Sequence, residues 1–246
     1  MMKENMKRIY AHRGMSSLAP ENTLLAFRLC AEHRVAWFEC DIDILSDGTI
    51  VVFHDDTLER CTDGSGPLFA QTRASLNTLD AGSWFSPRFA GERVPTLAQL
   101  IALMNRCRLN ANIEIKPGER TPEATASLLK GLDAALDRLD AERQYLISSF
   151  DPSLVGAFKQ QRPQADVACL FENEALNDGW RETMARVGAT AIHPQNEGLT
   201  RCQVEAFKAA GFLVNVWTVN DAQRARELFE WGVDGIFTDY AQEFVD

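Results

Sequence analysis

Residues 190–237 read TAIHPQNEGLTRCQVEAFKAAGFLVNVWTVNDAQRARELFEWGVDGIF and are the most informative part of the chain for its architecture. Short apolar runs alternate here with longer amphipathic segments, which is typical of strands alternating with helices. We predict strands at 190–193, 212–218 and 233–237, and helices at 200–210 and 221–231. Apolar strands separated by helices indicate a parallel sheet whose outer face is covered.

The same alternation extends back to the start of the chain. Further strands are predicted at 8–11, 36–45, 50–54, 110–115, 145–149 and 165–170. Further helices are predicted after Ala19–Thr23, at 95–106, at 121–140, after Asp151–Pro152 and at 174–187. If 50–54 is the second arm of a hairpin with an Asp-Gly turn, eight strand–helix units remain. That count predicts an α/β fold, a TIM (β/α)8 barrel, in a chain of this length.

Residues 55–94 interrupt this rhythm. The segment contains several Gly, Ser and Pro residues and shows little hydrophobic periodicity. Loops of this length are uncommon in compact domains unless they serve a function. We therefore expect one domain over 1–246, with a small insertion after the second strand at about 55–94 that lies on the active-site side of the barrel.

Composition and charge restrict the class of partner. The chain has 246 residues and a formal net charge of −10 at pH 7, which disfavours nucleic acid and anionic membranes as partners because both attract basic surfaces. The six cysteines are dispersed and show no zinc-site spacing, so we expect reduced thiols. No signal peptide and no apolar run of about 20 residues is evident, so we expect a cytoplasmic protein without stable membrane association.

Carboxylates gather at the predicted strand ends. Glu39 and Asp41 are two residues apart, so they point to the same side of their strand, and Glu114 shares a side with Lys116 in the same way. Three acids converging in a barrel mouth favour a hard divalent cation such as Mg²⁺, Mn²⁺ or Ca²⁺. The alternative is that the acids are solvated or paired with Arg13 and Lys116.

Two of the four histidines follow predicted strands close to these acids. His12 and His54 can act as general base and general acid near neutral pH. The alternative for each is a capping or core histidine. We place His33 on the surface, and we leave His193 outside the core site, either facing substrate or packed at its strand end.

Arg13 and Lys116 add fixed positive charge beside the acids. An arginine can hold a phosphate with two parallel hydrogen bonds, although both cations can also neutralise the neighbouring carboxylates. Trp217, at the end of a predicted strand, either walls a pocket or is a core aromatic. A divalent metal ion, two histidines and two basic side chains together favour phosphoryl-transfer chemistry.

The chain also carries a set of motifs with fixed spacing that covers about residues 8–240. They are Ala11-His12-Arg13-Gly14, Pro20-Glu21-Asn22-Thr23, Glu39-x-Asp41, Asp47-Gly48-x-x-Val51-Val52-x-His54-Asp55, Leu58-x-Arg60-x-Thr62-x-Gly64-x-Gly66, Glu114-Ile115-Lys116, Ser148-Ser149-Phe150, Val216–Asn220 and Gly232–Asp239. In these motifs the sequence resembles the glycerophosphodiester phosphodiesterase family, in its short cytosolic bacterial form.

The resemblance implies a metal-dependent hydrolase that cleaves glycerophosphodiesters, such as glycerophosphocholine or glycerophosphoethanolamine, to sn-glycerol 3-phosphate and an alcohol. It implies the following roles: Glu39, Asp41 and Glu114 bind one divalent cation, His12 and His54 are the acid–base pair, and Arg13, Lys116 and Trp217 contact the substrate. Alternatives are a lysophospholipase D, a phosphatidylinositol-type phosphodiesterase or a barrel that only binds a phosphorylated ligand. The metal, the alcohol, the role of each histidine, the nucleophile and the oligomeric state stay open.

Overall fold

A closed parallel barrel forms the centre of the molecule in the computed structural model, which describes residues 7–118, 120–176 and 179–245. Its eight strands pair in sequence order, and pairing of the first two closes the circle. They are β1 (Arg8–Ala11), β2 (Trp37–Ile44), β4 (Asn110–Ile115), β5 (Tyr145–Ser149), β6 (Val167–Phe171), β7 (Ala191–Pro194), β8 (Leu213–Val216) and β9 (Gly235–Thr238). The predicted TIM barrel is confirmed.

A ninth strand, β3 (Ile50–Val52), pairs antiparallel with the end of β2. It is the hairpin arm that the Asp-Gly turn predicts, and Gly48 occupies the left-handed region of that turn with φ of +84°. The arm lies outside the closed circle, so it does not alter the eight-stranded count.

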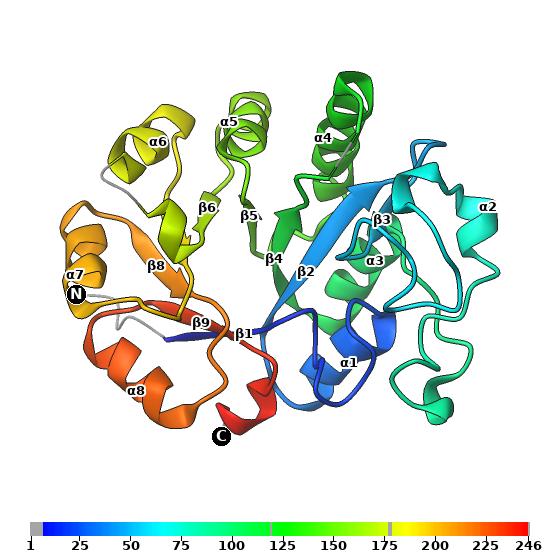
Figure 1. Cartoon of the computed structure of the whole chain (residues 1–246), viewed down its shortest axis with the longest axis horizontal. Coiled ribbons are helices and arrows are strands. Elements are labelled where there is room, and N and C mark those ends of the chain that lie inside the picture. The colour runs from blue at the N-terminus through cyan, green and yellow to red at the C-terminus, as the bar shows by residue number, and fades with distance from the viewer. Residues whose placement is uncertain (1–6, 119, 177–178, 246) are drawn as a thin grey trace.

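Helices surround the barrel (Figure 1). The helices of at least eight residues are α1 (Leu24–Glu32), α3 (Leu97–Cys107), α4 (Pro122–Leu136), α5 (Pro152–Gln161), α6 (Trp180–Val187), α7 (Arg201–Ala209) and α8 (Ala222–Glu230). Threonines cap α1, α3, α4 and α7 through a side-chain oxygen that accepts an N–H of the first turn. These caps fix the point at which each loop over the barrel mouth becomes helix.

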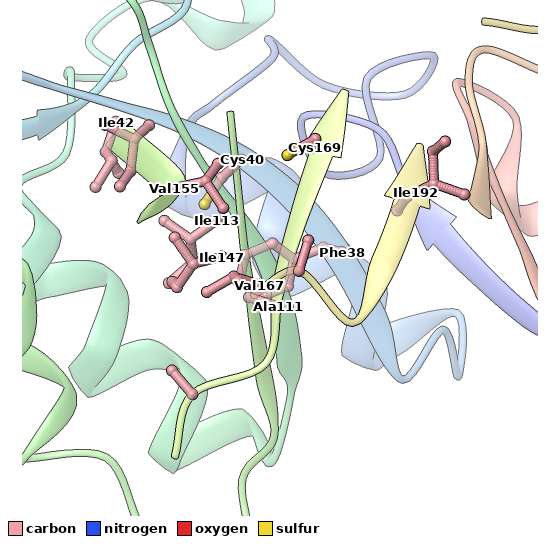
Figure 2. Packing of buried hydrophobic residues seen from close by; sticks show 14 of the residues in the cluster. Phe38, Cys40, Ile42, Ala111, Ile113, Ile147, Val155, Val167, Cys169 and Ile192 are labelled. Carbon is pink, nitrogen blue, oxygen red and sulfur yellow. The ribbon is translucent and has the colours of Figure 1, made fainter. Parts of the chain in front are cut away.

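The main core lies between strands and helices. Phe38, Cys40 and Ile42 alternate along β2 with the acids and join this core, as do Ile113 on β4 and Ile147 on β5 (Figure 2). Because strand side chains alternate between faces, the residues between them point into the barrel. The same alternation therefore supplies both the core and the polar interior.

The insertion packs on the β2–β3 hairpin through a second apolar cluster. It contains the short elements η1 (Leu68–Ala70), α2 (Arg73–Leu76) and η2 (Pro87–Phe89). The cluster consists of Leu45, Val51, Phe53, Leu58, Cys61, Leu68, Leu76, Ala81 and Val94. This packing gives the segment an ordered structure despite its lack of hydrophobic periodicity.

Two predicted helices have different bounds. The helix predicted at 121–140 ends at Leu136, because the N–H groups of Arg138 and Leu139 bond three residues back and the chain tightens into a turn. The helix predicted at 174–187 starts only at Trp180 after a separate short turn, η3 (Asn173–Ala175), and its residues 177 and 178 lie outside the described part.

All six cysteines are free, and four of them are buried. Within the described ranges, no helix combines the length and apolar character needed to cross a membrane.

Candidate active site

A cavity of about 620 Å³ opens at the carboxyl ends of the barrel strands. Its lining contains all eight residues that the sequence singled out: His12, Arg13, Glu39, Asp41, His54, Glu114, Lys116 and Trp217. The other lining residues are Asn112, Pro117, Phe150, Leu170, Glu172, Thr218 and Phe237. Active sites of TIM barrels lie at this face, where the loops after the strands converge.

Three buried carboxylates form the centre of the cavity. Asp41 on β2 lies in register with Glu114 on β4, and Glu39 is one pleat earlier on β2. One carboxylate oxygen from each of the three residues lies within 4.8 Å of those from the other two. The spacing of two along a strand and the register between strands therefore bring the predicted acids together.

The surroundings of these three acids shift their pKa values in opposite directions. Burial, followed by the charges of Asp41 and Glu114, raises the pKa of Glu39 well above its ordinary value. Burial, followed by the charge of Asp41, raises the pKa of Glu114 to about 7. Burial acts on Asp41 in the same direction, but the charges of Arg13 and Lys116 outweigh it and lower its pKa. Three such carboxylates without a further cation therefore resist full ionisation.

Arg13 and Lys116 lie against the acids. Lys116 Nζ is 2.9 Å from Glu114 Oε1 and 3.6 Å from Asp41 Oδ1, and Arg13 Nε is 3.6 Å from Asp41 Oδ2. Both cations line the cavity, so neutralising the carboxylates and facing a bound anion are compatible. The pairing of both cations with the acids is therefore observed, and their contact with a phosphate stays a prediction.

The turn after β1 needs unusual backbone angles. Arg13 has φ of +56°, and its N–H donates to Glu39 Oε2 at 2.9 Å. Gly14 follows with φ of +81°, and a β-carbon there would lie 2.9 Å from the backbone of Ala26 in α1. Glycine is therefore required where this turn meets the helix.

His12 is held by a carboxylate from the other end of the chain. Its Nδ1 lies 2.7 Å from Asp239 Oδ1, just after β9, and its Nε2 lies 3.9 Å from Glu39 Oε2. An ionised carboxylate only accepts hydrogen bonds, so Nδ1 carries the proton and Nε2 is left to exchange one with a ligand. Burial opposes ionisation of Asp239, but the contact with His12 outweighs it and lowers the Asp239 pKa.

His54 has the equivalent arrangement from its own sequence neighbour. Its Nδ1 lies 2.6 Å from Asp55 Oδ1. Burial raises the pKa of Asp55, yet hydrogen bonds from Arg60 and His54 outweigh that and lower it to about 2. Burial lowers the pKa of His54, since it disfavours the imidazolium more than the charge of Asp41 favours it. A mainly neutral imidazole at pH 7 follows.

Similarity to known proteins identifies the family of this chain. Over residues 12–243 the sequence matches the Glycerophosphoryl diester phosphodiesterase family. The chain belongs to this family. A curated glycerophosphodiester phosphodiesterase of Caldanaerobacter subterraneus is 33% identical over 239 residues, which cover 97% of this chain and 96% of that protein. Another, of Bacillus subtilis, is 28% identical, and the match covers 95% of this chain and 84% of that protein.

Solved phosphodiesterase structures have the same fold as this chain. An Oleispira antarctica phosphodiesterase in complex with the product sn-glycerol-3-phosphate has a TM-score of 0.91 at 30% identity, with 97% of this chain and 95% of that chain covered. A glycerophosphodiester phosphodiesterase of Agrobacterium tumefaciens has a TM-score of 0.77 at 28% identity, covering 97% of this chain and 99% of that one. The predicted family and the phosphodiesterase class are confirmed.

In this family member, one wall of the cavity is apolar. Phe150, Leu170, Trp217 and Phe237 line that part of the cavity. The rings of Phe150 and Trp217 meet edge to face at 5.3 Å, and Trp217 Nε1 donates to the carbonyl of His193 at 2.8 Å. Trp217 is therefore fixed at the pocket wall and is not a core aromatic.

The two remaining histidines lie outside the cavity. His33 is an exposed residue at the end of α1, as predicted. His193 is fully buried on β7, where Asn215 Nδ2 lies 3.0 Å from its Nε2. Burial lowers the pKa of His193 to about 3. Of the two possibilities left open for His193, the packed strand end is the one observed.

Sequence reasoning missed the residues that hold the site. In the sequence these residues stand out only as motif positions: Glu21, Asn22, Asp55, Arg60 and Asp239. For Asp55 the signal was its place directly after His54. For Asp239 it was the closure of the barrel, which sets β9 beside β1.

The acid cluster fits the divalent cation that the family implies. Arg13 N–H, Asn22 Nδ2 and Lys116 Nζ each engage one oxygen of a different carboxylate, which orients all three groups. Glu39 Oε1 is buried and makes no hydrogen bond within the described part of the chain. An unpartnered oxygen in an all-carboxylate set suits a hard cation such as Mg²⁺ or Ca²⁺.

Proposed function

We propose that this enzyme hydrolyses glycerophosphodiesters, such as glycerophosphocholine or glycerophosphoethanolamine, to sn-glycerol 3-phosphate and an alcohol. One divalent cation, Mg²⁺, Ca²⁺ or Mn²⁺, would be held by Glu39, Asp41 and Glu114. The observation that carries the proposal is the pair of cavity histidines, each with a carboxylate at Nδ1, beside the acid cluster. The product bound to the Oleispira antarctica phosphodiesterase supports the choice of substrate class.

The proposed reaction needs charge neutralisation and two proton transfers. When bound, the divalent cation supplies Lewis acidity that withdraws charge from the phosphoryl group. Arg13 and Lys116 bind phosphate oxygens, the arginine through its planar fork. One histidine accepts the proton of the attacking hydroxyl, from water or from the glycerol 2-hydroxyl, at Nε2. The other, protonated at both ring nitrogens, donates its Nε2 proton to the leaving alcohol oxygen. With water as the nucleophile, this step gives sn-glycerol 3-phosphate directly. With the glycerol 2-hydroxyl it gives a cyclic phosphate, which water then opens while the two histidines exchange roles.

The apolar wall of the cavity suits the uncharged part of a substrate. Trp217 is held by its contacts with Phe150 and His193, so it can bind the carbon skeleton of the glycerol or the alcohol without rearranging.

We also propose that residues 1–246 act as one domain in the cytoplasm, where a reducing environment keeps thiols such as the six free cysteines unoxidised.

The test is a coupled assay of sn-glycerol 3-phosphate release from a panel of glycerophosphodiesters. We expect turnover of glycerophosphocholine or glycerophosphoethanolamine, loss of turnover with a chelator, and recovery on adding Mg²⁺, Ca²⁺ or Mn²⁺. Full activity in the presence of chelator would remove the metal from the account. Faster cleavage of lysophosphatidylcholine than of glycerophosphocholine would instead favour a lysophospholipase D.

A further inference from the structure

Arg60, in the insertion, bridges two carboxylates that support the site. Its Nε and Nη2 donate to Asp55 at 2.6 and 2.7 Å, and its Nη1 and Nη2 donate to Glu21 at 2.8 Å each. Within the residues described here, it is the only side chain that bonds both acids, and it does not itself line the cavity. The guanidinium thus spans the β1–α1 loop and the loop after β3.

Each of these carboxylates continues to a cavity residue. Asp55 Oδ1, which accepts from Arg60, also lies 2.6 Å from His54 Nδ1. Glu21 Oε1, which accepts from Arg60, also accepts from Arg13 Nη1 at 2.8 Å. One arginine therefore connects a histidine and a cation that follow two different strands, β3 and β1.

The insertion holds Arg60 at this place. Leu58 and Cys61 flank it and are buried in the insertion's apolar cluster, and Thr62 Oγ1 donates to the Leu58 carbonyl at 2.7 Å. In the same loop, the Leu58 N–H donates to the Gly66 carbonyl at 3.1 Å. The anchored backbone limits the positions open to the guanidinium, although 44% of the Arg60 side chain is exposed.

We propose that Arg60 is a positioning residue that sets the imidazole of His54 through Asp55 and the guanidinium of Arg13 through Glu21. The inference rests on the proposed function, because it assigns separate duties to His54 and Arg13. It makes the insertion part of the catalytic apparatus, since it supplies the one group that joins both contacts. Arginine suits this task because its planar fork can form paired hydrogen bonds to each carboxylate, whereas a lysine offers only a compact point charge.

The influence of Arg60 should be confined to one half of the site. His12 is held by Asp239, whose other partners are Ser16 and Asn220, and none of these contacts Arg60. Lowered pKa values of Glu21 and Asp55 agree with tight pairing: burial acts against ionisation of each, and hydrogen bonds from Arg60 outweigh it.

The first experiment compares Arg60→Ala, Arg60→Lys and wild type as metal-loaded enzymes on glycerophosphocholine. For Arg60→Ala we expect kcat to fall about 10- to 100-fold, as for loss of a group that orients a catalytic residue. KM and the dissociation constant of sn-glycerol 3-phosphate, measured by calorimetry, should both rise because Arg13 is released. Arg60→Lys should recover part of each loss. Unchanged kcat and KM in both variants would overturn the proposal.

Double-mutant cycles separate the two routes. In an Asp55→Asn background, Arg60→Ala should lower kcat by no more than about twofold, because the route to His54 is already broken. In a Glu21→Gln background, Arg60→Ala should leave KM within about twofold. The same fold-loss in these backgrounds as in wild type would contradict positioning through these carboxylates.

Arg162→Ala is the matched control. Arg162 also pairs with two carboxylates, Asp133 at 2.5 Å and Asp137 at 2.9 Å, but it does not line the cavity. The Arg162→Ala variant should have a lower thermal midpoint and unchanged kcat and KM.

If Arg60→Ala does not fold, the Arg60→Lys variant tests the proposal, and wild-type kinetics in that variant refute the role. A wild type that releases no sn-glycerol 3-phosphate refutes the proposed function, whereas an active wild type with an unaffected Arg60→Ala refutes only the positioning.

Discussion

Replacing Asp239 with asparagine changes one oxygen to an amide nitrogen at the point where His12 is held. Asp239 Oδ2 accepts from Asn220 Nδ2 at 2.7 Å, while its Oδ1 lies 2.7 Å from His12 Nδ1. Asn220 cannot turn over without loss, because its own oxygen accepts from Thr238 Oγ1 and from the Asp239 N–H. The new amide nitrogen therefore has to face His12.

That orientation reverses the tautomer of His12. An N–H donor at Nδ1 moves the imidazole proton to Nε2, so a ring that must accept a proton there no longer can. Positioned acid–base groups contribute about 10²–10⁴-fold to rates. We expect Asp239→Asn to lower kcat about 100-fold, which corresponds to about 2.7 kcal/mol in activation free energy. KM should change little, since Asp239 does not line the cavity.

The measurement is steady-state release of sn-glycerol 3-phosphate from glycerophosphocholine with saturating divalent cation. Asp133→Asn is the control, because its carboxylate accepts from the side chain of Arg162 and lies outside the cavity. It should retain wild-type kcat. A kcat for Asp239→Asn within about threefold of wild type would show that this hydrogen bond does not hold His12 in its working state.

Further predictions concern the metal, the acid limit of stability and the packing. Glu39→Gln should weaken binding of Mg²⁺ or Ca²⁺ at least about tenfold by calorimetry, with exposed Asp47→Asn unchanged. Because the folded pKa of His193 is lowered to about 3, its contribution to stability is complete above pH 6.5 and falls by about 1.4 kcal/mol per pH unit below it; His193→Gln should remove that slope in urea titrations. Leu128→Ala, in the core, should cost about 2–5 kcal/mol of unfolding free energy, and a smaller loss would indicate loose packing.

Local patterns were enough for the barrel and for the chemistry-bearing side chains. Period-two alternation along β2 places Glu39 and Asp41 on the inner face, and the same rule places Glu114 on β4. Strand-end positions sufficed for His12 and Lys116, because all parallel strands of a barrel end at one face. These features depend on residues within a few positions of one another and on one rule of topology.

The supporting contacts depend on closure and on an irregular segment. Asp239 reaches His12 across 227 positions only because β9 pairs with β1. Arg60 lies where periodicity is absent, so no pattern predicts which carboxylates it meets. The predicted end of α4 was wrong, because Leu139 continues the helical spacing of apolar residues although the backbone has already tightened into a turn.

The paired action of His12 and His54 is tested most directly by removing each imidazole in turn. Divalent-cation binding to His12→Ala and His54→Ala is measured by calorimetry, and the same samples are assayed for release of sn-glycerol 3-phosphate from glycerophosphocholine. We predict that both variants bind the cation as wild type does and that both lose about 10²–10⁴-fold in kcat. Near wild-type turnover in either variant with the cation bound would contradict the paired acid–base account.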